Sequence, residues 1–138
     1  MQIAALHHVA VNVTDLERSR AFYRDTLGLT EIERPPFNFP GAWFLLGTSQ
    51  HLHLIVHPGA TFREGKKLDT RDTHFAVRVN DYWATAEFLQ SRGYRIDAED
   101  EFRRIIINPQ ATAGFPQMYI MDPDRHVIEI NAAQLSPG

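Results

Sequence analysis

The stretch Met121-Asp-Pro-Asp-Arg-His-Val-Ile-Glu-Ile-Asn131 decides the fold of this chain. Its Asp-Pro-Asp segment is typical of a turn, because proline fixes φ and aspartate side chains bond the neighbouring backbone. The β-branched residues that follow are typical of a strand. Glu129 then lies on the opposite strand face from Ile128 and Ile130. A carboxylate inside a strand needs solvent, a cation or a metal, because burying an isolated charge is costly. An exposed strand glutamate and a metal ligand both fit this stretch alone.

Composition indicates an ordinary globular protein. The chain has 138 residues, enough for one core or for two small modules packed together. A net charge of -3 gives no reason to expect nucleic acid or an anionic membrane as a partner. The absence of cysteine excludes disulfides and thiolate chemistry. The first residues lack the pattern of a signal peptide, and no apolar run is long enough to span a membrane, so we expect a cytoplasmic protein.

The first half of the chain reads strand, helix and three strands. Residues 6–13 alternate, with valines on one face and a histidine on the other. Asp15 is a good N-cap for an amphipathic helix that Gly28 can end. Short strands are expected at 29–33, 42–46 and 52–57.

The second half repeats this order after a polar segment, 58–72, that is predicted to be a linker or flap. Asp81 and Gly93 match the two helix-bounding residues of the first half. Strands are expected at 74–79, 94–98, 117–121 and 127–130, with 99–116 partly loop. The sequence therefore predicts an α+β fold in a single domain, residues 1–138, built from module one (4–57), a linker (58–72) and module two (73–132).

Four ionisable residues recur at matching places in the two modules. His8 and His74 lie in the first strands, and His53 and Glu129 lie in the last strands. Each is predicted on the face that is not purely aliphatic. Three imidazoles and one carboxylate suit Zn, Ni, Fe, Mn or Co. If the modules pair about a pseudo-twofold axis, the four side chains converge, and the sequence then predicts a metal site.

The competing interpretation is that these histidines are structural or surface residues, since the chain has seven. His7 is predicted on the opposite strand face from His8. His51 shares a face with the last-strand histidine and is the nearest competitor as a ligand. Surface or rim positions are expected for His57 and His126.

The pattern resembles the vicinal oxygen chelate superfamily, which includes glyoxalase I, fosfomycin-resistance proteins, bleomycin-resistance proteins, methylmalonyl-CoA epimerase and extradiol dioxygenases. The similarity runs from about Leu6 to Asn131. It is carried by His8-Val-Ala-Val, the helix that begins at Asp15, Thr73-His74-Phe-Ala-Val, and the Asp-Pro-Asp turn with its strand. Residues 34–44 and the strand His53-Leu-Ile look most like glyoxalase-I-like proteins.

The resemblance implies two paired βαβββ modules that form an open, U-shaped mixed sheet around a central cleft with a divalent metal. It also implies a substrate bound through two vicinal oxygens, and a homodimer. Two features depart from the family pattern. His53 stands where glyoxalase I has a glutamate, which leaves Glu129 as the only carboxylate of the four. Arg125 stands where the turn usually has glycine.

The resemblance favours an enzyme, a metal-dependent lyase or isomerase of the glyoxalase type. Glu129 is then a metal ligand, and the candidate catalytic base is Glu129 or a metal-bound water. Arg103 or Arg104 is expected to hold a substrate anion. Four aromatic residues are expected to line an apolar pocket, with an ordinary core role as the alternative: Phe37, Phe39, Trp43 and Phe115.

Three other functions stay open at this point. A mononuclear iron dioxygenase needs only two histidines and one carboxylate, which His8, His74 and Glu129 can supply. A fosfomycin-type thiol transferase is the second. The third is a metal-free protein that binds a drug or metabolite, as bleomycin-resistance proteins do.

Overall fold

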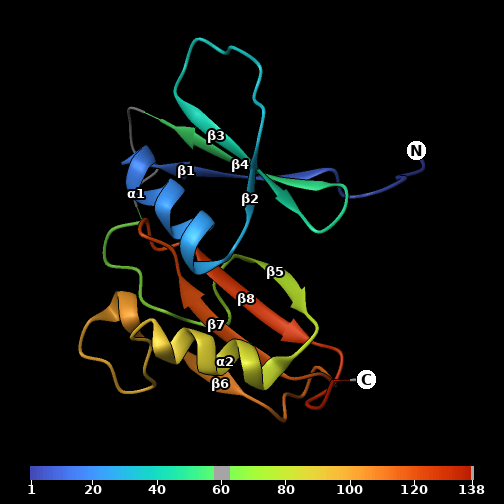
Figure 1. Cartoon of the computed structure of the whole chain (residues 1–138), viewed down its shortest axis with the longest axis vertical. Helices are drawn as coiled ribbons and strands as arrows, with labels where there is room; N and C mark the ends of the chain where they lie inside the picture. Colours follow the sequence, from blue (N-terminus) through green and yellow to red (C-terminus); the bar gives the residue numbers. More distant parts are fainter. Residues whose placement is uncertain (58–62, 138) are drawn as a thin grey trace. The chain divides into compact units, whose positions relative to one another are not determined.

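The computed structural model of the protein describes residues 1–57 and 63–137. It divides the chain into two compact units, Met1–Phe62 and Arg63–Gly138. Each unit contains one four-stranded mixed sheet and one main helix (Figure 1). The α+β class and the βαβββ order of both modules are confirmed. Part of the expected linker, residues 58–62, lies outside the described residues.

The first unit runs strand, helix, strand, strand, strand. Its sheet has the order β1-β4-β3-β2, in which β1 is parallel to β4 and the other pairs are antiparallel. The helix α1 continues directly into a π-helical turn, η1. The bounds are β1 His8–Val13, α1 Leu16–Ala21, η1 Phe22–Thr26, β2 Thr30–Ile32, β3 Gly41–Leu46 and β4 Gln50–Val56.

Local sequence explains the first helix and its packing. The Asp15 side chain accepts a bond from the backbone nitrogen of Arg18, which caps the helix as predicted. Gly28 ends the helical segment with φ of +68°. One face of the sheet packs against this helix and forms the core of the unit. Buried core residues include Val11, Val13, Phe22, Tyr23, Ala42, Phe44, Leu52 and Leu54.

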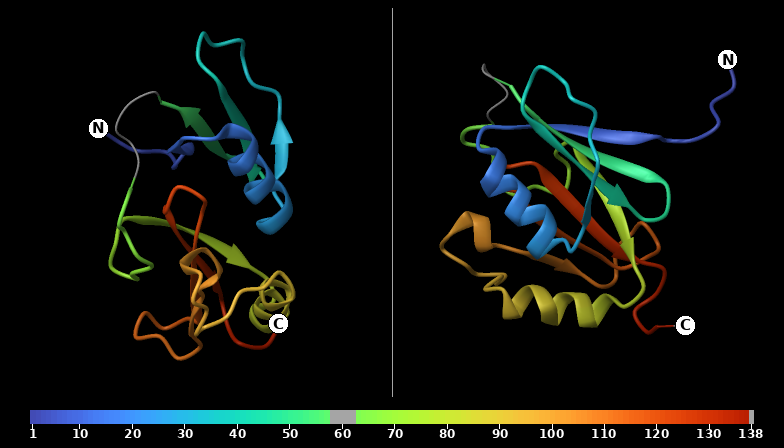
Figure 2. Two further views of the ribbon diagram at one scale, coloured as in Figure 1. Left: turned by 90° about the vertical axis from the view of Figure 1, so that its left-hand side faces the viewer. Right: turned by 45° about the horizontal axis from the view of Figure 1, so that its top comes forward.

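The second unit repeats the arrangement with the strand order β5-β8-β7-β6. Its parallel pair is β5 with β8, and the remaining pairs are antiparallel. The helix α2 runs along one face of this sheet (Figure 2). The bounds are β5 His74–Val79, α2 Tyr82–Ser91, η2 Glu101–Arg103, β6 Ile106–Asn108, β7 Gln117–Met121 and β8 Val127–Ala132.

One strand prediction in this unit is wrong. Residues 94–98 do not form a strand, and the second strand of the unit is β6, inside the segment that was expected to be partly loop. Arg95 makes only an isolated bridge with Arg104. The side chain of Tyr94 is buried in the core, although the backbone at this position is not part of a sheet.

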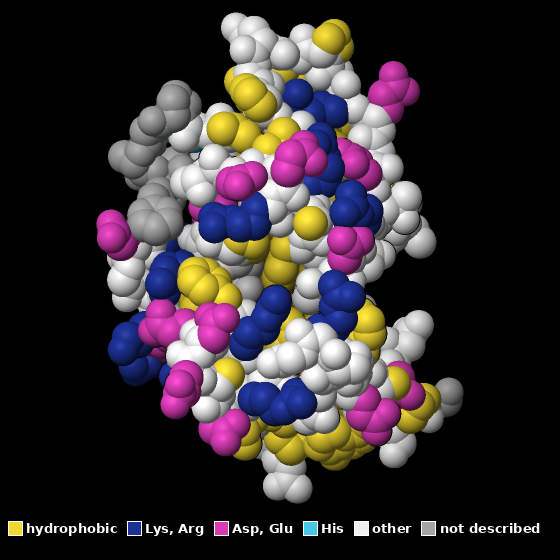
Figure 3. All heavy atoms as spheres, turned by 60° about the vertical axis from the view of Figure 1, so that its left-hand side comes forward, with side chains coloured by type: hydrophobic (Ala, Val, Ile, Leu, Met, Phe, Trp, Pro, Cys, Tyr) yellow, Lys and Arg dark blue, Asp and Glu magenta, His cyan; other side chains and the backbone are white. Residues whose placement is uncertain are grey.

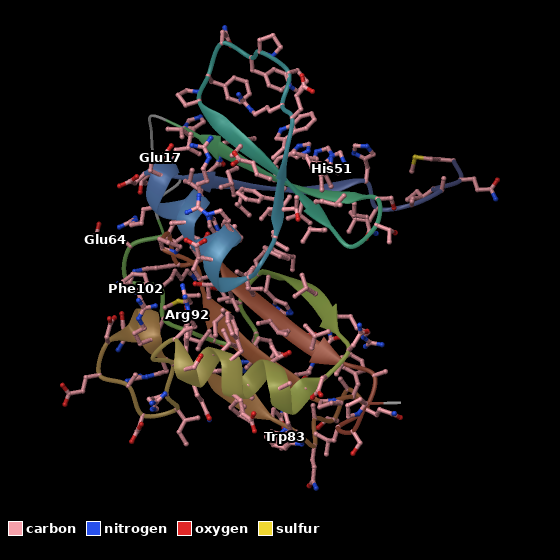
Figure 4. The ribbon with its side chains drawn as sticks, in the orientation of Figure 1. Glu17, His51, Glu64, Trp83, Arg92 and Phe102 are labelled. Atoms are coloured by element: carbon pink, nitrogen blue, oxygen red, sulfur yellow. The ribbon has the colours of Figure 1, made fainter. Side chains whose placement is uncertain are left out.

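The helix α2 buries one of its faces against the sheet. Tyr82, Ala86 and Leu89 are buried, and their spacing places them on one helix face. Trp83 and Phe88 are 46% and 45% exposed. Trp83 points away from the sheet (Figure 4).

The turn before β8 has the predicted chemistry. Oδ1 of the buried Asp122 accepts bonds from the backbone nitrogens of Asp124 and His126, at 2.9 and 2.8 Å. Arg125 has φ of +68°, and it is the one non-glycine residue with positive φ among the described residues. Its Nη1 donates to Glu101 at 2.8 Å. Arg125 thus has a strained backbone conformation, and its guanidinium bonds a residue outside the turn.

Charges of both signs are interspersed on the face shown in Figure 3. No helix within residues 1–57 and 63–137 is long and apolar enough to cross a membrane.

Candidate functional site

The first unit brings His8 and His53 together. β1 and β4 are adjacent, with Ala10 beside His53 in the register, so the two histidine side chains share the sheet face opposite the core. Their rings stack with centroids 4.2 Å apart and planes 19° from parallel. Trp43, which pairs with His53 across β3 and β4, stacks on it at 4.0 Å and 4°. The imidazole of His53 is therefore packed between two other rings.

This packing controls the charge of His53, which is only 8% exposed. The pKa of His53 is lowered to about 4, first by burial and then by the neighbouring His8, His51, His7 and Arg34, in that order. The side chain is therefore neutral at neutral pH. A neutral imidazole is the form that binds metals.

Two further histidines lie beside this pair. Nδ1 of His7 is 2.8 Å from Nδ1 of His8, and Nδ1 of His51 is 3.4 Å from Nε2 of His53. The prediction that His7 points to the opposite side is wrong. β1 begins only at His8, so the alternation of side chains along a strand does not apply to His7. His51, which comes from β4 (Figure 4), shares the face of His53 as predicted.

The aromatic candidates of this unit form a cluster around Arg34. Its Cζ lies 4.8 Å from the ring centre of Phe37 and 4.9 Å from that of Phe39. Phe37 in turn lies 6.0 Å from Trp43, centre to centre. Phe37 is 46% exposed and Phe39 is 37% exposed, so the alternative of an ordinary core role is wrong for these two residues.

The second unit brings His74 and Glu129 together. Nε2 of His74 lies 3.6 Å from Oε1 of Glu129. The two side chains come from the adjacent parallel strands β5 and β8 and lie on the face away from Ile128 and Ile130. Glu129 is 5% exposed, so the interpretation as a solvent-exposed strand glutamate is wrong.

Three donors orient the Glu129 carboxylate. Oε1 accepts from the hydroxyl of Tyr119 and from Nε2 of Gln117, each at 2.9 Å. Oε2 accepts from Nδ2 of Asn131. Burial, followed by the bond and the charge of Glu129, raises the pKa of Tyr119 to about 12, so this hydroxyl keeps its proton. Sequence reasoning missed these donors, although strand alternation in β7 and β8 places all three on the face of Glu129.

The other ring nitrogen of His74 fixes its tautomer. Nδ1 lies 2.7 Å from the backbone oxygen of Asp72. A carbonyl only accepts, so Nδ1 carries the proton and a neutral ring presents an unprotonated Nε2 to Glu129. Two acceptors, Nε2 and Oε1, then face each other. This arrangement calls for a positive charge, either a proton on His74 or a metal ion.

The donor types fit a divalent transition metal. Metal–nitrogen and metal–oxygen distances of about 2.0 to 2.2 Å allow one ion to contact both atoms of the His74–Glu129 pair. A histidine that donates Nδ1–H to a backbone carbonyl is the usual support for an Nε2 ligand. No set of three or more His, Cys, Asp or Glu side chains arranged to hold a metal occurs within residues 1–57 and 63–137. The four predicted ligands lie as one pair in each unit, His8 with His53 and His74 with Glu129.

The predicted anion-binding arginines have local roles. Nε and Nη2 of Arg104 donate to the backbone oxygen of Ala98. The Cζ of Arg103 lies 5.5 Å from the ring centre of Tyr94. Both side chains therefore hold the segment that follows α2.

A different arginine lies on the face of Glu129. Nε of Arg78 donates to Oδ1 of Asn131 at 2.8 Å, and its Cζ lies 5.0 Å from the ring centre of Phe115. Sequence reasoning missed the role of Arg78, although the alternation of β5 places it on the same face as His74. Phe115, predicted to bind substrate, is half-buried beneath this guanidinium.

Comparison with known proteins gives a family match over most of the chain. Residues 5–130 match the model of the Glyoxalase/Bleomycin resistance protein/Dioxygenase superfamily. No curated protein matches the chain.

Many solved structures have a similar fold. A protein from Bacillus anthracis assigned to the glyoxalase family is 24% identical, with 96% of this chain and 97% of that chain covered and a TM-score of 0.74. The antibiotic binding protein TnmS3 from Streptomyces sp. CB03234 is 24% identical, with 100% and 99% covered and a TM-score of 0.68. The fosfomycin resistance protein FosX from Listeria monocytogenes is 18% identical, with 97% of each chain covered and a TM-score of 0.67. At these identities the similarity shows a shared fold.

Proposed function

The chain belongs to the glyoxalase/bleomycin resistance protein/dioxygenase superfamily, and on that premise we propose that it is a metal-dependent lyase or isomerase of the glyoxalase type. The proposed substrate is a small molecule that binds the metal through two vicinal oxygens. The proposed ligands are His8, His53, His74 and Glu129. Neither nucleic acid nor a membrane is part of this proposal, and a homodimer is expected.

The observation that carries the proposal is the pair of facing acceptors in the second unit. Nε2 of His74 and Oε1 of Glu129 are 3.6 Å apart, and each is held in place by separate hydrogen bonds. Orienting two acceptors toward each other is unfavourable unless a proton or a metal ion lies between them, and we propose the metal ion. The neutral state of His53 supports the same interpretation for the first unit.

The protein residues then have distinct roles. A divalent metal bound here supplies Lewis-acid stabilisation of a developing oxyanion. Glu129 is the only carboxylate of the proposed set, so it is the group proposed to accept the substrate proton. The Tyr119 hydroxyl and the Gln117 amide hold its Oε1 in position. Asp72 holds the ring of His74 through its backbone oxygen.

Elemental analysis of tag-free protein purified without chelators tests the proposal. We expect about one transition metal per chain in the wild type, the content of a single site. Glu129→Gln and His53→Ala should each lower that content. Glu87→Gln, on the exposed side of α2, and His57→Ala, at an exposed position, are the matched controls and should retain it. A wild-type protein that stays metal-free after dialysis against Zn, Ni, Fe and Mn would rule out the metal-dependent enzyme.

A metal-free binding protein is the second candidate. The described residues contain no group of three or more donors arranged for a metal, and the aromatic cluster of Phe37, Phe39 and Trp43 offers ring surface for an apolar ligand. This function predicts binding of an aromatic small molecule that does not depend on added metal. Loss of that binding in Phe37→Ala, with no metal in the wild type, would favour it over the enzyme.

A further inference from the structure

We infer that Arg78 binds an anionic group of the substrate, separate from the oxygens that contact the metal. This inference rests on the proposed function and names its substrate class, which is a small acid with a second, distal anionic group. The argument depends on where Arg78 lies, on what holds its side chain, and on which of its nitrogens are unused.

Arg78 lies on the sheet face that carries the His74–Glu129 pair. In the register of β5 and β8, Ala76 is beside Glu129 and Arg78 is beside Asn131. Residues two apart in a strand point to the same face, so Arg78, Asn131 and Glu129 share it. The strand rise places Arg78 about 7 Å along the sheet from the level of Glu129. Arg78 is exposed, whereas Glu129 and Asn131 are buried.

The side chain of Arg78 is held in one orientation. Its Nε donates to Oδ1 of Asn131 at 2.8 Å, and Nδ2 of the same amide donates to Oε2 of Glu129. The ring of Phe115 lies under the guanidinium, 5.0 Å from ring centre to Cζ. The amide of Asn131 therefore links the orientation of the guanidinium to that of the candidate metal-binding carboxylate. Little side-chain freedom remains to be lost on binding a ligand.

The terminal nitrogens of Arg78 are unused. Within the described part of the chain, Nη1 and Nη2 of Arg78 make no hydrogen bond or ion pair. The other held arginines of this unit differ. Arg125 pairs with Glu101, Arg63 pairs with Asp72, and Arg104 bonds the backbone oxygen of Ala98. A fixed guanidinium with two unused donors matches the paired oxygens of a carboxylate, phosphonate or sulfonate.

The spacing suggests a probe for this inference. 2-Hydroxyglutarate carries an α-hydroxy acid, which offers two vicinal oxygens, and a second carboxylate at the other end of a five-carbon chain. 2-Hydroxypentanoate has the same carbon chain and the same α-hydroxy acid but lacks the distal carboxylate. Comparing the two acids isolates the contribution of the distal anion.

Isothermal titration of each acid into the zinc-loaded protein gives the test. We expect the wild type to bind 2-hydroxyglutarate at least about tenfold more tightly, which corresponds to one charge-assisted contact. In Arg78→Gln the two acids should bind with the same affinity. Arg71→Gln, which removes an arginine whose side chain is 91% exposed, is the matched control and should keep the preference.

The outcomes separate the two proposals. If the wild type binds both acids equally, or if Arg78→Gln keeps the preference, the inference about Arg78 is wrong while the metal-dependent function stands. If the zinc-loaded protein binds neither acid, substrate chelation through vicinal oxygens fails, and the inference fails with it. Loss of the preference in Arg78→Gln but not in Arg71→Gln supports both.

Discussion

The indole of Trp43 and the imidazole of His53 stack with ring centres 4.0 Å apart and planes 4° from parallel. His8 covers the other side of the same imidazole at 4.2 Å. Both faces of the His53 ring are therefore shielded from water, which disfavours its charged form. The consequence is a histidine that stays neutral well below the pH at which exposed histidines are protonated.

Replacing Trp43 should raise the pKa of His53. In Trp43→Leu one face of the ring loses its cover, so the largest cause of the lowered pKa, burial, is weakened. We expect the pKa to move from about 4 toward the ordinary value near 6.5. An NMR titration of the histidine ring protons of the metal-free protein measures it. Trp83→Leu, the same change at an exposed tryptophan, should leave the titration unaltered. A His53 pKa that stays near 4 in Trp43→Leu would contradict this account.

Protonation of His53 at acidic pH should destabilise the metal-free protein. Its pKa is lower in the folded state than in the unfolded state, so the unfolded chain binds the extra proton first. The free energy of unfolding should therefore fall as the pH drops from about 6.5 to about 4, by at most about 3 kcal/mol. Urea unfolding at several pH values measures this slope. His53→Phe keeps an aromatic ring at the position, and its stability should fall less over the same range. An equal fall in both proteins would assign the acid sensitivity to other groups.

The repeated fold could be predicted because its signals are local. The caps at Asp15 and Asp81 and the chain reversals at Gly28 and Gly93 each depend on a few neighbouring residues, and the structure contains helices with these N-caps. β6 was missed because its three residues show no alternation of polar and apolar side chains. Its identity as a strand depends on pairing with β7, which is far away in the sequence.

The candidate site could be predicted only in part. Strand alternation placed His53 and Glu129 on the correct faces, and this needs no knowledge of the partner strands. The partners of each side chain depend on register, which the sequence does not reveal. Gln117 and Tyr119 became donors to Glu129 because β7 pairs with β8 at one particular offset. Only their charge indicated Arg103 and Arg104 as anion-binding residues. In the structure Arg103 lies over the ring of Tyr94, and Arg104 donates to the backbone oxygen of Ala98.

The hydroxyl of Tyr119 should stabilise the protein more than a comparable buried hydroxyl does. Tyr119 donates to a carboxylate, whereas the buried Tyr82 donates to the backbone oxygen of Gln117. Hydrogen bonds to charged groups contribute about 1.5 to 3 kcal/mol, and neutral ones contribute about 1 kcal/mol. Tyr119→Phe should therefore lower the free energy of unfolding more than Tyr82→Phe does, as measured by urea denaturation. In a Glu129→Gln background the two tyrosine changes should cost the same, and a difference that survives there would show that the Glu129 charge is not its source.

The Arg125→Gly variant should have a higher free energy of unfolding than Arg125→Ala, and both should be less stable than the wild type. The backbone has φ of +68° there, which costs a residue with a Cβ roughly 1 kcal/mol or more and costs glycine little. Arg125→Gly and Arg125→Ala lose the same ion pair with Glu101 and the same contact over Phe102, so these losses cancel in their comparison. We expect the free energy of unfolding of Arg125→Gly, measured with urea, to exceed that of Arg125→Ala by about 1 kcal/mol. Glu101→Gln, which removes the ion pair without changing residue 125, measures the part of the shared loss that comes from the ion pair. Equal stabilities of the glycine and alanine variants would show that the turn relaxes to a negative φ when the arginine is removed.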